Sequence, residues 1–283
     1  MKTALVTLIV GMPYQCAWRE VCEPGWRAYA KRHGYDIITI EEPLDRSTRA
    51  LNRSPSWQKC IVLGASVCRG YDRIVWVDSD IVINPSAPAV TKGVPIEKIG
   101  VTDEMLALSS QDRNEVLTFL SERCKTMAPD LLTFALHSYR DPSAYHAAWG
   151  LPRRGAHILQ AGLLVLSPKY HRSLLEHVYF AYEDKGAATN YEMRPLSFEI
   201  QDRGLQHLID QRFNALIVWS LHRYQICVTK AVSTPEHISV FIASEYKNNY
   251  FLHFAGRQNL LNTAKMALDG LLPGHDCSSS GAD

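Results

Sequence analysis

Apolar runs of the length of a buried β-strand recur along the first half of the chain. A strand that is covered on both faces of a sheet reads as such a run. A helical segment at 26–34 closes at Gly34, and a second one extends over 56–70. Strands alternating with helices predict an α/β fold, with a mainly parallel sheet covered by helices on both faces. The three predicted strands are 3–10, 35–40 and 72–80.

The second half of the chain is less regular, and no repeat or composition shift marks a linker. We therefore predict a single domain over residues 1–275, with a disordered polar tail at 276–283. The expected helices are 111–124, 172–186 and 194–210, the expected strands are 157–168, 215–219 and 250–256, and a loop is expected at 141–156.

Composition narrows the class of protein. The chain has 283 residues, of which 46% are hydrophobic and 21% charged, which is typical of a globular protein. A net charge of +1 predicts no attraction to nucleic acid. The seven cysteines are scattered without a C-x-x-C pair, which favours reduced thiols and a cytoplasmic location. No run approaches the roughly 20 apolar residues of a transmembrane segment, so we expect at most peripheral membrane contact.

Two carboxylates at the end of the strand 72–80, Asp78 and Asp80, come directly after the apolar residues 74–77. Side chains at positions i and i+2 of a strand point the same way, about 7 Å apart at Cα. Ligands collect at the carboxyl ends of strands in open α/β sheets, and carboxylates suit Mg²⁺ or Mn²⁺. The pair predicts a divalent-metal site, although D-x-D is a weak motif by itself.

Several classes of protein fit this D-x-D. In a haloacid-dehalogenase-type phosphatase Asp78 would be the nucleophile, but that fold places the motif on its first strand and needs a later acidic motif. Here 77 residues precede Asp78, and no G-D-x-x-x-D follows. A sugar-phosphate nucleotidyltransferase and a non-catalytic nucleotide-sugar-binding protein remain as further alternatives.

Four stretches in one order resemble the nucleotide-sugar glycosyltransferases of the GT-A fold. They cover residues 29–40, 56–85 (with W-x-K and D-S-D-I-V-I-N-P), 159–168 (LQAGLLVLSP) and 251–257 (FLHFAGR). The resemblance is greatest to retaining galactosyl-, mannosyl- and xylosyltransferases. It implies an α/β/α sandwich and transfer of a hexose from a nucleotide-diphosphate sugar, with UDP favoured. The implied acceptor is a saccharide or glycolipid, and the configuration would be retained.

The resemblance also implies a metal site. Asp78 and Asp80 would hold Mn²⁺ (or Mg²⁺) against the diphosphate, with His253 as the third ligand. An imidazole ligand favours Mn²⁺, because Mg²⁺ prefers oxygen. Arg257 would stabilise charge on the departing diphosphate, and Gly256 would allow close approach of the backbone.

Other positions match where the nucleotide lies in that fold. Thr7, Val10 and Tyr14 follow or end the first strand, where base and ribose are bound. Lys59, one helix before the metal strand, corresponds to a basic position that reaches the nucleotide. Ser79, between the two aspartates, belongs to the same group.

The donor sugar and the acceptor have candidates too. Gln160 stands where relatives have Asn, and its amide would bind sugar hydroxyls. Glu192 occupies the acidic position beside the donor sugar, where it would position or stabilise the oxocarbenium-like sugar. Asp103 and Glu104 are weaker candidates for the same role. The aromatic stretch 137–155 is expected to be an acceptor-side loop.

Overall fold

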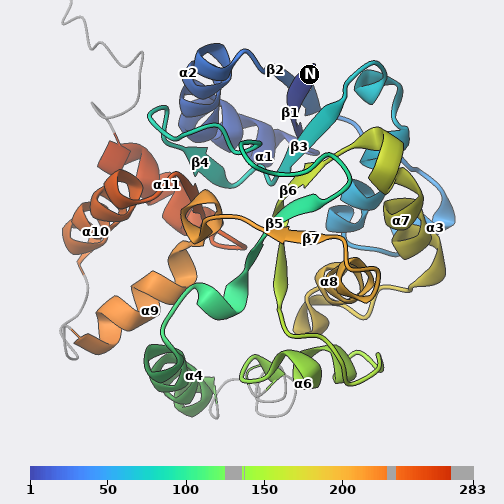
Figure 1. Ribbon diagram of the computed structural model, residues 1–283. Coiled ribbons are helices and arrows are strands. Elements are labelled where there is room, and N and C mark those ends of the chain that lie inside the picture. Colours follow the sequence, from blue (N-terminus) through green and yellow to red (C-terminus); the bar gives the residue numbers. More distant parts are fainter. Residues whose placement is uncertain (125–135, 137, 228–233, 269–283) are drawn as a thin grey trace, which may run out of the picture.

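Six strands form a central sheet in the order β2-β1-β3-β6-β5-β7 (Figure 1). The computed structural model describes residues 1–124, 136, 138–227 and 234–268. Strand β6 is antiparallel to both of its neighbours, whereas the other three pairings are parallel. The predicted α/β class with a mainly parallel sheet is therefore confirmed. The strands are β1 (Thr3–Leu8), β2 (Asp36–Ile40), β3 (Arg73–Val77), β5 (Ile99–Asp103), β6 (Leu159–Leu166) and β7 (Gln206–Leu208).

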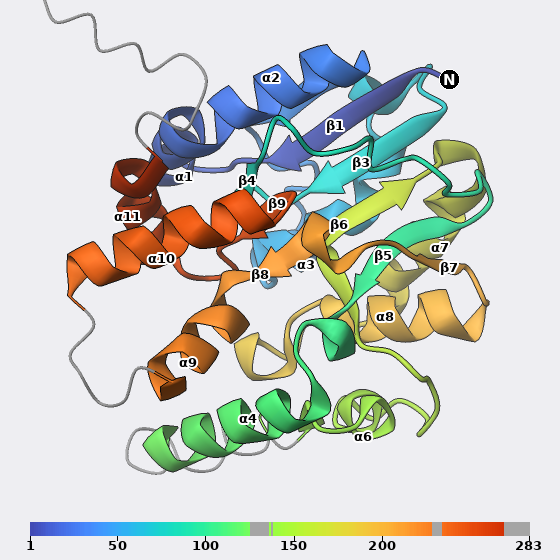
Figure 2. The same ribbon diagram turned by 60° about the vertical axis from the view of Figure 1, so that its left-hand side comes forward.

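Two apolar cores lie on opposite faces of this sheet, because successive side chains of a strand point to opposite faces. On β3, Val75 and Val77 belong to one core, and Ile74 and Trp76 belong to the other. The first core is closed by helices α2 (Glu23–His33), α10 (Pro235–Asn248) and α11 (Gln258–Leu268), and the second by the 3-10 helix η2 (Pro55–Gly64) with α7 (Pro168–Ala181) and α8 (Met193–Asp202) (Figure 2).

A second, smaller sheet lies beside the end of β3. Its strands are β4 (Ile81–Ile83), β9 (Phe251–His253) and β8 (Ala215–Leu216), in the order β4-β9-β8. Strands β4 and β9 are antiparallel, with Ile81 opposite His253. The strand that leaves the two aspartates is thus paired with the strand that carries the predicted third metal ligand.

The remaining helices are mostly short. Helix α4 packs against α9. In sequence order these elements are α1 (Met12–Ala17), the π-helix η1 (Trp18–Cys22), α3 (Thr48–Leu51), η3 (Ser66–Cys68), η4 (Glu104–Leu106), α4 (Ser110–Cys124), α6 (Pro142–Ala147), η5 (Ala187–Thr189), η6 (Gln211–Asn214) and α9 (Ile217–Cys227). Within the described residues, no helix has both the length and the apolar character needed to cross a membrane.

Some sequence-based predictions of elements are wrong. The apolar run at 215–219 forms a strand over only two residues and then enters helix α9. The helix predicted over 194–210 ends at Asp202, and strand β7 follows it. The segment 56–70 is built of 3-10 turns in place of one α-helix.

The aromatic stretch 137–155 is only partly a surface loop. In its described part, which excludes residue 137, residues 152–155 are exposed and belong to no helix or strand, whereas the middle of the stretch is buried. Tyr145, His146 and Trp149 are buried, and the two larger rings belong to the second core. Helix α6 begins within this stretch, so a segment that looks irregular in sequence contributes to the core. The tail predicted to be disordered, 276–283, lies outside the described residues.

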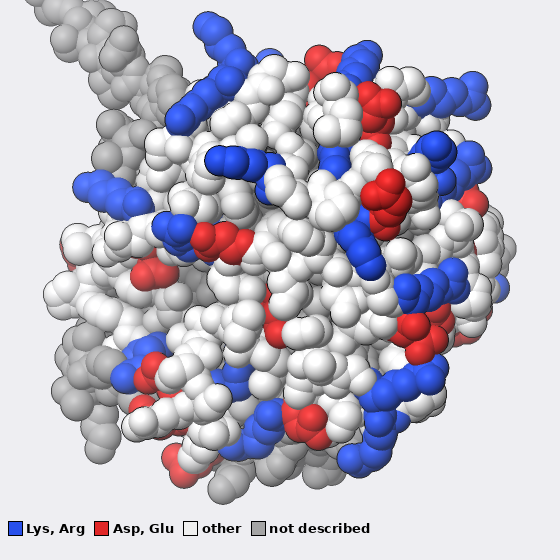
Figure 3. All heavy atoms as spheres, viewed as in Figure 1, with Lys and Arg blue, Asp and Glu red and all other residues white. Residues whose placement is uncertain are grey.

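Charged side chains of both signs are interspersed over the face shown in Figure 3. Basic residues do not gather there into a stripe of the kind that tracks a nucleic-acid backbone.

Candidate functional site

The candidate site lies where β3 ends against the middle of β6. The backbone N–H of Asp78 donates a hydrogen bond to the carbonyl of Gly162 (2.8 Å), which is the last tie between the two strands on that side. Beyond it the chain turns, because the N–H of Ile81 donates to the carbonyl of Asp78 (3.2 Å). This turn presents both aspartates at the carboxyl end of the strand, as predicted from their spacing.

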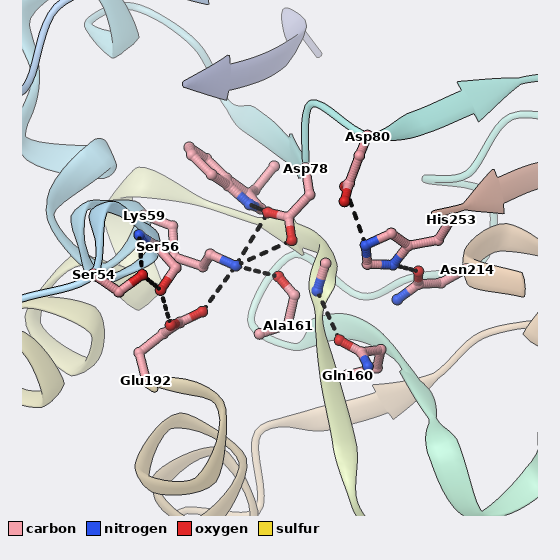
Figure 4. Close-up of polar contacts among 12 residues, drawn as sticks. Ser54, Ser56, Lys59, Asp78, Asp80, Gln160, Ala161, Glu192, Asn214 and His253 are labelled. Atoms are coloured by element: carbon pink, nitrogen blue, oxygen red, sulfur yellow. Dashed lines mark hydrogen bonds and ion pairs between the residues drawn. The ribbon is translucent and has the colours of Figure 1, made fainter. Parts of the chain in front are cut away.

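Asp78, Asp80 and His253 come together at this turn (Figure 4). One ligand atom from each lies within 4.8 Å of the others. The imidazole Nε2 is 3.2 Å from Asp80 Oδ1. Two carboxylates and an imidazole are a donor set that fits a divalent transition-metal ion such as Mn²⁺. The structure therefore brings together the three side chains that the sequence motifs had singled out.

Gly162 makes room for the imidazole. A Cβ atom at this position would lie 2.4 Å from Cε1 and 2.7 Å from Nδ1 of His253, and 3.4 Å from an oxygen of Asp78. The glycine of the stretch LQAGLLVLSP, one of the four that carry the family resemblance, is thus explained by steric contact with the His253 ring. Any larger residue would displace the ring.

Asn214 fixes the orientation of the same ring. Its side-chain Oδ1 lies 2.8 Å from His253 Nδ1, so Nδ1 carries the proton and donates to the amide oxygen. The Nε2 lone pair is then directed toward Asp80, where a metal would be bound. Ligating histidines commonly have such a partner on the second nitrogen. Sequence analysis missed Asn214, which is 39 residues from His253.

A buried lysine, Lys59, forms an ion pair with Asp78. Lys59 Nζ is 3.1 Å from Asp78 Oδ1 and 2.9 Å from Glu192 Oε1, and it donates to the carbonyl of Ala161 (3.2 Å). Burial disfavours its charged form, but the attraction of Asp78 and Glu192 outweighs burial and raises the pKa of Lys59. Trp76 Nε1 also donates to Asp78 Oδ1 (2.7 Å). Asp78 is therefore held in place by groups from two elements.

The two aspartates differ in their acidity. Burial raises the pKa of Asp78 despite the opposing effects of Lys59 and His253. At Asp80 burial acts in the same direction, but the His253 ring and the Gly256 N–H outweigh it and lower the pKa. Burial opposes protonation of His253, and Asp80 together with Asp78 nevertheless raises its pKa. Asp80 is thus the more strongly ionised carboxylate.

A cavity of about 340 Å³ opens in front of the aspartates. The predicted residues that line it are Val10, Tyr14, Lys59, Asp78, Ser79, Asp80 and Gly256. Its other lining residues are Leu8, Ser54, Pro55, Ser56 and Trp76. Trp76 had a signal in the sequence, since it stands two positions before Asp78 on the same face of the strand. Ser54 and Pro55 had none, because they read as part of a polar loop, and Ser56 read only as the start of a helix.

Five of the principal predicted residues are not among those that line the cavity, and one of them is the metal-site residue His253. Thr7 is fully buried inside β1. The Arg257 side chain is exposed, just beyond Gly256. Glu192 is buried and paired with Lys59, and it also accepts a hydrogen bond from Ser56 Oγ (2.5 Å). Gln160 is buried next to Gly162, and both ends of its amide are engaged by the protein.

The engagement of Gln160 involves Glu104, one of the weaker candidates. Gln160 Nε2 donates to Glu104 Oε2 (3.2 Å), and Gln160 Oε1 accepts from the Gly162 N–H (3.2 Å). Glu104 Oε1 in turn accepts from Trp219 Nε1 (2.8 Å). Burial raises the pKa of Glu104. The other candidate, Asp103, is paired with His157 Nδ1 (2.7 Å).

No protein-family model matches this sequence. No curated protein sequence matches it significantly.

Several solved structures are similar to this protein. A glycosyltransferase involved in the glycosylation of the major capsid of PBCV-1 is 16% identical, with a TM-score of 0.50 over 92% of this chain and 98% of that one. Mouse xyloside xylosyltransferase 1 is 14% identical (TM-score 0.41, 89% and 97% covered), and the galactosyltransferase LgtC is 10% identical (TM-score 0.42, 95% and 96% covered). The first likeness shows a shared fold, which confirms the GT-A architecture predicted from the motifs.

Proposed function

We propose that this protein is a metal-dependent glycosyltransferase that moves a hexose from a UDP-sugar to a saccharide or glycolipid acceptor in the cytoplasm. The observation that carries the proposal is the meeting of Asp78, Asp80 and His253 beside a cavity at the carboxyl end of β3. The fold shared with a solved glycosyltransferase supports it. The proposed location is supported by Cys16, Cys22, Cys60 and Cys68, which are free thiols.

Each part of the cavity suits a part of the donor. Val10 and Tyr14 offer an apolar wall and an exposed ring for the base. Lys59 offers a cation beside the phosphates. Asp78, Asp80 and His253 would hold Mn²⁺, which, when bound, neutralises the charge that develops on the departing diphosphate. The imidazole in the set favours Mn²⁺ over Mg²⁺.

The proposed sugar-side roles follow from the observed contacts. Glu192 acts by positioning Lys59, to which it is paired at 2.9 Å. Gln160 acts by anchoring the Gly162 backbone behind the metal ligands. Arg257 is exposed next to the cavity residue Gly256. From this position its guanidinium would contact the diphosphate of a bound donor.

Retention of configuration is part of the proposal. Asp78 and Asp80 are the only carboxylates among the described residues that line the cavity, and both belong to the proposed metal site. No lining carboxylate is left to act as a base on the acceptor, which favours proton transfer to the leaving phosphate oxygen.

The test is hydrolysis and transfer with a panel of UDP- and GDP-sugars in the presence of Mn²⁺. We expect slow release of UDP from one sugar, lost in Asp80→Ala and retained in Asp36→Ala. Asp36 is a suitable control because it lies at the amino end of β2, which runs parallel to β1 and β3. The aspartate pair lies at the carboxyl end of β3. Release of pyrophosphate from a nucleoside triphosphate and a sugar phosphate would identify a nucleotidyltransferase. Release of inorganic phosphate from a simple ester would identify a phosphatase. Either outcome overturns the proposal.

A further inference from the structure

Every backbone carbonyl of the turn from Asp78 to Ile81 accepts a hydrogen bond. The Asp78 carbonyl accepts from Ile81 N–H within the turn, and the Asp80 carbonyl accepts from Phe254 N–H (3.0 Å) after β9. The other two carbonyls, of Ser79 and Ile81, flank Asp80 in the sequence. Both are bound by side chains.

These two side chains come from one helical segment behind the turn. Cys22 Sγ lies 3.3 Å from the Ser79 carbonyl, and a thiol is protonated at neutral pH, so it is the donor. Trp26 Nε1 donates to the Ile81 carbonyl at 2.8 Å. Cys22 and Trp26 are both fully buried. Neither side chain reaches the cavity, since neither is among its lining residues.

Helix α2 approaches the β4 backbone as closely as the chain allows. A Cβ atom at Gly25 would lie 2.3 Å from the carbonyl oxygen of Ile83. Strand β4 pairs with β9 on its other side, so the helix occupies its open edge. Cys22, Gly25 and Trp26 therefore cover the edge of β4 and the turn before it.

The backbone conformation of η1 contributes to this fit. Residues Trp18–Cys22 form a π-helix that runs directly into α2. Single π-helical turns inserted before or within α-helices change the direction of the side chains that follow, and they are frequent at functional sites. Here the turn places Cys22 and Trp26 against carbonyls that are two residues apart in the chain.

We propose that Cys22 and Trp26 are positioning residues of the metal site: they fix the carbonyls of Ser79 and Ile81 and thereby hold Asp80 opposite His253. The inference rests on the proposed metal-dependent function. Asp80 lies between the two fixed carbonyls, and Ile81 is the residue that pairs with His253. A shift of this backbone therefore moves Asp80 and the register with His253 together.

Trp18 provides a matched control for Trp26. Its ring is also buried and packs edge-on against Trp26, with centroids 5.6 Å apart. However, the Trp18 Nε1 atom has no hydrogen-bond partner among the described residues. Trp→Phe at either position makes the same chemical change in the same core, but only Trp26→Phe removes a hydrogen bond to the aspartate turn.

The measurement is Mn²⁺ affinity, from the electron paramagnetic resonance signal of free Mn²⁺, at a temperature where circular dichroism shows each variant fully folded. We expect Trp26→Phe to weaken Mn²⁺ binding about 10-fold, the lower end of the roughly 10- to 100-fold typical of residues that orient ligands. Trp18→Phe should leave the affinity within about 2-fold of wild type. Cys22→Ala should weaken binding, and Cys22→Ser, which keeps a donor, should restore most of it.

Equal affinities in Trp26→Phe and Trp18→Phe, with Cys22→Ala like wild type, would overturn the inference and leave the metal site itself intact. If Trp26→Phe does not fold, the Cys22 pair decides alone. Failure of the wild-type protein to bind Mn²⁺ would instead overturn the proposed function, so the two failures can be told apart.

Discussion

Two buried histidines, His253 and His146, show how differently one residue type is used in this molecule. His253 is surrounded by Asp80, Asp78 and the Asn214 amide. His146 is packed between the rings of Tyr145 and Phe198. Charged neighbours raise the pKa of His253, whereas burial lowers the pKa of His146 to about 4. Burial alone does not distinguish the two histidines, but the charges around them do.

The polar contacts of the two rings also serve different purposes. Near His146, the Ser197 hydroxyl lies 3.1 Å from the imidazole and also accepts from the Leu159 N–H (2.9 Å). These bonds tie α6 and α8 to β6. Around His253, the oxygen and nitrogen atoms converge on one point beside a cavity. One region uses polar groups to complete the packing, and the other gathers them beside a cavity.

Gly→Ala substitutions on the neighbouring strands β6 and β5 should distinguish the proposed metal site from ordinary packing in the sheet most strongly. Gly162→Ala would push into the His253 ring, and we expect Mn²⁺ affinity to fall at least about 100-fold, more than a change of an orienting residue causes. Gly100→Ala on β5 would instead press on Val165 and Val94, 2.9 and 3.0 Å away. Overpacking of this kind costs about 1–3 kcal/mol of unfolding free energy.

Both variants should therefore lose stability in urea unfolding, and only Gly162→Ala should lose metal affinity in titration calorimetry. Loss of Mn²⁺ binding in Gly100→Ala as well would mean that the metal site responds to any strain in the sheet. The contrast between the metal site and the packed interior would then be wrong.

Asn214 offers a milder change. Asn214→Ala removes the acceptor of the His253 Nδ1 proton and frees the ring to turn, and we expect Mn²⁺ affinity to fall roughly 10- to 100-fold. Asn214→Asp keeps an acceptor in the same place and should bind Mn²⁺ nearly as well as wild type. The Asn214 Nδ2 atom has no partner among the described residues, so the alanine variant loses no other side-chain bond. Equal weakening in both variants would contradict the orienting role.

The sequence predicted the parts of the site that lie on strands. The apolar runs of β1 and β3 indicated which residues reach the carboxyl ends of these strands, and the order of the motifs indicated that His253 would join the D-x-D. The partners of these residues were not predictable. Asn214 and Trp26 act through contacts with residues 39 and 55 positions away, and neither has a local pattern that indicates such a contact.

The errors in the fold have physical causes as well. A short apolar run such as 215–219 is compatible with a buried helix or a strand, and tertiary packing decided for helix α9. Strand β5 was missed because Ile99–Asp103 contains a glycine and lacks a long apolar run. The stretch around Tyr145 looked irregular because its helix has only six residues, although it buries three large side chains.

The last prediction uses acid to sharpen the comparison of the two histidines. His146 has a pKa of about 4 in the folded protein, chiefly because it is buried, with a further contribution from Arg194. Its pKa in the unfolded chain is about 6.5. Between these values the unfolded state binds more protons, so His146 destabilises the fold as the pH falls. The expected loss in unfolding free energy from pH 7 to pH 5 is about 2 kcal/mol.

His253 should act in the opposite direction in the metal-free protein. Its pKa is raised in the folded state, so its contribution to stability is complete below about pH 6.5 and is lost as the pH rises through the raised value. Urea unfolding at pH 5 and pH 7 should then show a smaller acid loss in His146→Gln than in wild type, and a larger one in His253→Gln. Parallel changes in both variants would mean that the charges around His253 do not hold its proton. The distinction between a packing histidine and a ligand histidine would then have to rest on Asn214 and Gly162 alone.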